Sequence, residues 1–99
     1  MEILKFEFAA GNTPTKQALV GCVGSGDLEV LMEPSQTGKT SIQVVTSVDG
    51  SSQRWENLFT RMFSNQTLPA VHIEIHDFGA TPGVVRLRLE QAFEEVNCG

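Results

Sequence analysis

Apolar and polar residues alternate with a period of two along five stretches of the chain. This period places successive side chains on opposite faces of an extended strand, so strands are predicted over residues 2–9, 16–23, 28–33, 40–48 and 70–77. In the first stretch, Leu4, Phe6 and Phe8 share one face. Short loops join the first four strands, which favours an antiparallel meander.

Two other stretches show the period of a helix. The first carries apolar residues at i, i+3, i+4, i+7 and i+8, namely Trp55, Leu58, Phe59, Met62 and Phe63. Residues 49–52 offer N-cap side chains, and residues 64–66 followed by Pro69 end this helix. The stripe is interpreted as the face that packs on the sheet rather than as a ligand groove.

A second helix is predicted near the C-terminus. Thr81 is a good N-cap and Pro82 suits the first helical position. Arg86 and Glu90 are spaced for an i, i+4 ion pair. An apolar stripe follows the helical period, through Val85, Leu89, Ala92, Phe93 and Val96.

These elements predict one α+β domain over residues 1–99. It should have two layers, a four- to five-stranded and mostly antiparallel sheet with two helices on one face. A right-handed crossover from strand four through the first helix to strand five would make the sheet mixed. Trp55 should be largely buried, and the core should hold Leu4, Phe6, Val30, Val44, Leu58, Phe59, Met62, Ile73, Ile75, Leu89 and Phe93.

Composition narrows the class of protein. The chain has 99 residues, 40% of them apolar, and a formal net charge of −5. A negative charge with scattered basic residues disfavours binding to nucleic acid or to anionic membranes. No charged-then-apolar leader and no long apolar run occurs, so the expected location is the cytoplasm. Cys22 and Cys98 lack zinc-type spacing and are predicted to be reduced thiols.

The most distinctive short motif is Gly24-Ser25-Gly26-Asp27, which lies between two predicted strands. Glycine tolerates positive φ and has no side chain, so a turn of this kind leaves its serine uncovered. A plain hairpin turn accounts for the same residues. A glycine-rich turn can also present backbone N–H groups to a phosphate.

Other candidate chemistry is weak. His72 and His76 flank Glu74 on a strand, where the two histidines lie about 13 Å apart, too far for one metal ion. A solvated or subunit-facing strand surface is the preferred interpretation, and no metal site is predicted. Ser25 has no identifiable triad, and residues 37–40 resemble only the end of a phosphate-binding loop. Catalysis by the chain alone is therefore not expected.

Two separated segments carry a family resemblance. Residues 23–31, VGSGDLEVL, and residues 76–85, HDFGATPGVV, resemble the acyl carrier (delta) subunit of bacterial malonate decarboxylase. The similarity covers essentially the whole chain. The acyl carrier subunit of citrate lyase is a more distant relative in mode of action. Ordinary acyl carrier proteins differ, because they are four-helix bundles in which Asp-Ser-Leu opens a helix.

The resemblance implies a carrier rather than a catalyst. Ser25 would bear 2'-(5''-phosphoribosyl)-3'-dephospho-CoA through a phosphodiester, with Gly24, Gly26 and Asp27 as flanking recognition residues. The thiol of this arm would carry acetyl and malonyl thioesters. The implied partners are the acetyl-CoA/malonate transferase (alpha) subunit, the decarboxylase (beta and gamma) subunits and the holo-acyl-carrier synthase that attaches the arm.

Two alternatives to the carrier remain from the residues themselves. One is a structural or assembly subunit of a complex, without a covalent cofactor. The other is an anion-binding module built on the glycine-rich turn. The segment from Phe78 to Val85 is interpreted either as a docking loop or as a structural corner.

Overall fold

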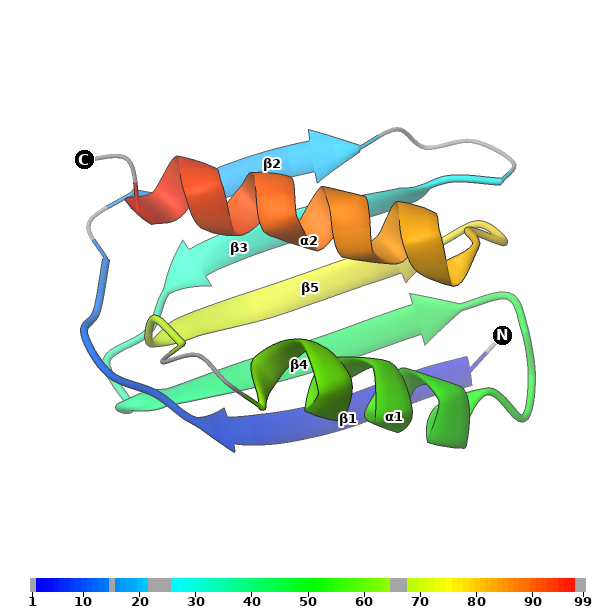
Figure 1. Ribbon diagram of the computed structural model, residues 1–99, viewed down its shortest axis with the longest axis horizontal. Coiled ribbons are helices and arrows are strands. Elements are labelled where there is room, and N and C mark those ends of the chain that lie inside the picture. Colours follow the sequence, from blue (N-terminus) through cyan, green and yellow to red (C-terminus); the bar gives the residue numbers. More distant parts are fainter. Residues whose placement is uncertain (1, 15, 22–25, 65–67, 98–99) are drawn as a thin grey trace.

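Five strands form one sheet, and two helices lie across the same face of it (Figure 1). The computed structural model describes residues 2–14, 16–21, 26–64 and 68–97. In chain order the elements are β1 (Glu2–Ala9), β2 (Ala18–Gly21), β3 (Leu28–Pro34), β4 (Lys39–Thr46), α1 (Ser52–Phe63), β5 (Val71–Asp77) and α2 (Pro82–Asn97). This arrangement confirms the predicted α+β class, with a mostly antiparallel sheet and the helices on one side.

The strand order is β1-β4-β5-β3-β2, so the predicted meander of the first four strands is wrong. Among the first four strands in the described part of the chain, β2 and β3 are the one consecutive pair that forms an antiparallel hairpin. β1 pairs with β4, and β1 and β2 form opposite edges of the sheet. The connection between them crosses the end of the sheet, where the Gly11 amide donates to the Leu68 carbonyl and the Ala70 amide to the Asn12 carbonyl. A period-two pattern identifies strands but carries no information about which strands are neighbours.

β5 fills the position between β3 and β4. It pairs with β4 in parallel and with β3 antiparallel, so the sheet is mixed. The crossover through α1 produces this parallel pair, as expected for a βαβ unit. The Thr40 hydroxyl donates to the Pro69 carbonyl at 2.8 Å and ties the entry of β5 to β4.

The core lies between the sheet and the helices. Of the predicted core residues, Val30, Val44, Phe59, Ile73, Ile75 and Leu89 are at most 1% exposed, and Leu4, Phe6, Leu58, Met62 and Phe93 are partly buried against them. Trp55 is 7% exposed, which confirms its predicted burial. Phe59 lies at the centre of an aromatic cluster with Phe6, Phe8, Trp55 and Phe63.

The helix starts differ in how they are capped. The Val84 amide donates to the Thr81 hydroxyl, so Thr81 caps α2 as predicted, and α2 begins at Pro82. Ser51 occupies the N-cap position of α1, but its hydroxyl donates to the Val48 carbonyl instead of capping the helix. This bond helps to close the turn between β4 and α1.

β4 ends two residues earlier than predicted. The Thr46 hydroxyl donates to Asp77 at 2.8 Å and accepts a hydrogen bond from the Val48 amide, which turns the chain away from the sheet. Val48 is 38% exposed and is not a core residue.

Candidate functional site

The predicted attachment turn lies between β2 and β3. Gly24 and Ser25 lie outside the described residues, whereas Gly21, Gly26 and Asp27 on either side are described. Gly21 has a φ of 97°, and a Cβ there would collide with the Leu28 carbonyl, so no larger residue fits. Gly26 has a φ of 80° and is exposed, and a Cβ there would meet nothing within 4 Å. The described flank nearest Ser25 is therefore open.

Asp27 is held by a residue from α2. The Arg88 guanidinium donates from Nη2 to Oδ2 of Asp27 at 2.8 Å and from Nε to Oδ1 at 3.2 Å. The Leu28 amide donates to the same Oδ1 at 2.7 Å. These bonds, with that from Arg88 as the main cause, hold the pKa of Asp27 below its ordinary value. Asp27 thus fixes one end of the turn to the helix layer.

The turn is also fixed to the segment that follows β5. The Gly26 amide donates to the Phe78 carbonyl at 2.8 Å, and the Phe78 amide donates to the Asp27 carbonyl at 2.9 Å. The buried Asp77 carboxylate accepts hydrogen bonds from the Gly79 and Ala80 amides as well as from Thr46. These contacts give the segment from Phe78 onward a structural role, and its predicted role in docking stays a prediction.

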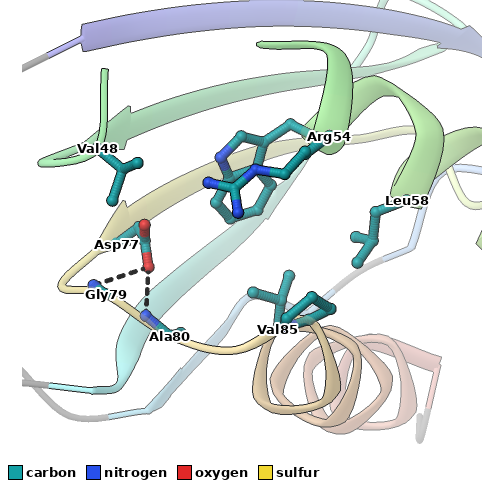
Figure 2. Close-up of a pocket in the computed structure, with 9 residues that line it drawn as sticks. Val48, Arg54, Leu58, Asp77, Gly79, Ala80 and Val85 are labelled. Atoms are coloured by element: carbon teal, nitrogen blue, oxygen red, sulfur yellow. Dashed lines mark hydrogen bonds between the residues drawn. The ribbon is translucent and has the colours of Figure 1, made fainter. Parts of the chain in front are cut away.

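A pocket of about 320 Å³ lies at the same end of the sheet, between the first turns of the two helices (Figure 2). Its apolar wall includes Val48, Trp55, Leu58 and Val85. Arg54 and Asp77 contribute the charged groups. Gly79 and Ala80, whose amides bind Asp77, form part of the rim.

The histidines of β5 lie elsewhere. His72 and His76 alternate with the buried Ile73 and Ile75, so they are on the sheet face opposite the helices. His72 is exposed, and its Nδ1 lies 2.8 Å from the Ser41 hydroxyl of β4. No group of three or more His, Cys, Asp or Glu side chains within the described part of the chain is arranged to hold a metal ion.

Sequence reasoning missed two parts of this site. Arg88 was not recognised because it lies 61 residues from Asp27, and no spacing rule connects residues so far apart. Arg54 was missed because the helix was predicted from its stripe of apolar residues, which includes its neighbour Trp55 but not Arg54. The i, i+4 pair of Arg86 and Glu90, which depends only on local spacing, is present at 3.1 Å.

We expect Arg88→Gln to destabilise the fold at pH 7 and to do so much less in acid. Because the pKa of Asp27 is lowered in the folded state, its pairing stabilises the protein above the ordinary value of 3.8. That stabilisation is lost as the pH falls through the lower, folded-state pKa. Urea unfolding of both proteins at pH 7 and at about pH 2 measures the difference.

Arg86→Gln is the matched control, because Arg86 is on the same helix in a pair whose two side chains are 59% and 58% exposed. It should change the free energy of unfolding by less than about 0.5 kcal/mol. An equal effect of the two substitutions, or a loss for Arg88→Gln that does not depend on pH, would contradict this role of the Asp27–Arg88 pair.

Comparisons with known proteins agree with one another. The family model described as malonate decarboxylase delta subunit (MdcD) matches residues 15–96. Proteins named malonate decarboxylase acyl carrier protein from Pseudomonas syringae pv. tomato and Stutzerimonas stutzeri are 72% and 71% identical over 96 residues, which is 97% of each chain.

A solved structure is also similar. It is titled as a crystal structure of a Pseudomonas malonate decarboxylase hetero-tetramer in complex with malonate. The TM-score is 0.94 at 70% sequence identity, and the match covers 97% of this chain and 99% of the other.

Proposed function

Because this chain belongs to the malonate decarboxylase delta subunit (MdcD) family, we propose that it is the acyl carrier subunit of a malonate decarboxylase. Ser25 is the attachment point for 2'-(5''-phosphoribosyl)-3'-dephospho-CoA. The observation that carries the proposal is the Gly-Ser-Gly-Asp turn in a chain that matches proteins named as acyl carriers over nearly its full length.

The residues beside Ser25 suit a covalent arm. Gly26 leaves open space where any other residue would place a side chain. The bonds of Asp27 with Arg88 and of Gly26 and Asp27 with Phe78 hold the residues that follow Ser25 in place, so the arm is attached next to a fixed segment of backbone. The thiol of the bound arm supplies the thioester chemistry, and the protein supplies the tether that raises the local concentration of the acyl group at each partner.

The partners of the carrier follow from this role. We propose that the alpha subunit exchanges acetyl for malonyl on the arm and that the beta and gamma subunits decarboxylate the malonyl group. A holo-acyl-carrier synthase attaches the arm to Ser25. The similarity to a chain from a malonate decarboxylase hetero-tetramer supports a role within such an assembly.

Intact-mass spectrometry of the protein from its native cell tests the proposal. The mass should exceed that of the 10.8 kDa chain by that of the arm, and peptide mapping should place the addition on Ser25. An unmodified chain in the working complex would favour the alternative, an assembly subunit without a covalent cofactor. Attachment at another residue would overturn the role of Ser25.

The purified chain should have no decarboxylase or hydrolase activity by itself, because a carrier depends on its partner subunits for the chemistry. The two histidines of β5 lie on the sheet face away from the helices, where His72 contacts the Ser41 hydroxyl, and no group of three or more His, Cys, Asp or Glu side chains in the described part of the chain could hold a metal ion. The measurement is release of carbon dioxide or free coenzyme A from malonate or malonyl-coenzyme A, with the full complex as the positive control. Turnover by the isolated chain would contradict the carrier role.

A further inference from the structure

The pocket between the two helix starts has the size and lining of a small-molecule site. Its volume of about 320 Å³ and its mainly apolar wall with few polar groups match typical ligand pockets. Trp55 and Leu58 come from α1, Val85 comes from α2, and Asp77 is the last residue of β5 (Figure 2 shows Leu58, Val85 and Asp77).

The two charged groups of this pocket differ in their partners. Asp77 accepts hydrogen bonds from Thr46, Gly79 and Ala80. Arg54 is exposed, lines the pocket (Figure 2), and has no hydrogen bond or ion pair with the described residues. Asp77 is buried and its carboxylate is occupied by these donors, so the charged group exposed to a ligand at the opening is the Arg54 guanidinium.

The pocket is adjacent to the base of the attachment turn. The Gly26 amide binds the Phe78 carbonyl at 2.8 Å, and Gly79, the next residue, lies on the pocket rim. Consecutive Cα atoms are about 3.8 Å apart, so the residue that anchors the turn is the immediate neighbour of a residue on the pocket rim. Gly26, the described residue next to Ser25 in the sequence, is therefore anchored beside this pocket.

A second pocket near the turn has the opposite charge character. It lies between β2 and α2 and is lined by Gly21 and Arg88, but also by Glu94 and Glu95. Arg88 is already paired with Asp27. The two glutamates repel an anionic ligand, so charge complementarity favours the pocket that contains Arg54.

We propose that the pocket beside Trp55 receives the thioester end of the carrier's own arm, and that Arg54 is the counter-ion of the malonyl carboxylate. This proposal rests on the function proposed above. The apolar wall excludes water from the thioester, while the guanidinium at the opening stabilises an acyl group that ends in a carboxylate. The acetyl form lacks this charge and binds in the pocket less strongly.

Trp55 provides a direct test. It is the only tryptophan, and the chain has no tyrosine, so emission excited at the tryptophan band reports on this pocket alone. Apo, acetyl-loaded and malonyl-loaded forms of the isolated carrier should give three different spectra, with the malonyl form furthest from apo. Intact mass of each sample confirms that the arm and acyl group are attached.

Arg54→Gln should make the malonyl and acetyl spectra alike. It should also speed the cleavage of the malonyl thioester by hydroxylamine about three- to fivefold, the size expected for one solvent-accessible ion pair, without changing the rate for the acetyl form. Arg61→Gln is the matched control, because Arg61 is exposed on the same side of α1 and about 10 Å further along its axis. It should behave as the unsubstituted protein.

The outcomes separate this proposal from the function on which it rests. An arm attached at Ser25 with identical Trp55 emission in all three forms would overturn the pocket and leave the carrier function in place. Equal effects of Arg54→Gln and Arg61→Gln would overturn the role of Arg54. A chain without the arm in its native cell would overturn both proposals.

Discussion

Ser25→Ala should abolish malonate decarboxylation by the assembled complex. The substitution removes the hydroxyl that we propose bears the arm, so no thiol would remain to hold the acetyl or malonyl group. Cys22 and Cys98 cannot replace it, because a cysteine side chain lacks the reach of a coenzyme A-derived arm. The assay is carbon dioxide release from malonate by a complex reconstituted with the substituted carrier.

The same substitution should leave the fold intact. The sequence predicts that Ser25 is exposed in a turn, and an exposed hydroxyl contributes little to stability, so the free energy of unfolding should change by less than about 0.5 kcal/mol. The neighbours that hold the turn, Gly21, Asp27 and Arg88, are unchanged. Circular dichroism and urea unfolding therefore separate loss of attachment from loss of structure. An alanine carrier that still supports turnover would show that the arm is elsewhere.

Ser25→Thr is the conservative companion of this variant. It keeps the hydroxyl but adds a methyl group that crowds it and restricts χ1. The protein should fold and accept the arm slowly, as measured by intact mass during modification by the synthase. Attachment at the unsubstituted rate would show that the synthase does not require an unhindered hydroxyl between the two glycines.

The elements of this fold could be predicted from sequence because their signals are local. The two-residue period predicted the five strands that the described residues form. The helical period, together with Thr81 and Pro82, predicted where α2 begins. Strand order was predicted wrongly because it depends on contacts between distant segments. Nothing in the alternation of β1 shows that it pairs with β4 rather than with β2.

The site was predictable only in part for the same reason. The motif from Gly24 to Asp27 is contiguous, so the sequence alone could single it out, whereas the contacts that hold Gly26 and Asp27 come from remote residues. Arg88 reaches Asp27 across 61 positions, and Thr46 reaches Asp77 across 31. The pocket combines the turn after β4, the first turns of both helices and the end of β5, which only the folded chain brings together.

Phe59→Ala should cost about 3–5 kcal/mol of the free energy of unfolding. Phe59 is 0% exposed, and its ring lies 5.2 Å from that of Phe6, 5.7 Å from Trp55 and 5.9 Å from Phe63, measured between centroids. Truncation leaves a cavity between α1 and the sheet and removes these aromatic contacts. A small domain has only about 5–15 kcal/mol of stability, so the variant should be close to unfolding at moderate temperature.

Urea unfolding followed by circular dichroism measures this loss, and Thr60→Ala is its control, because Thr60 is the next residue of α1 and is exposed. The control should change the free energy of unfolding by less than about 0.5 kcal/mol. A loss below about 1 kcal/mol for Phe59→Ala would mean that α1 does not pack on the sheet through this ring. Since Trp55, which packs against Phe59, also lines the pocket, the destabilised variant should show altered Trp55 emission even in the apo protein.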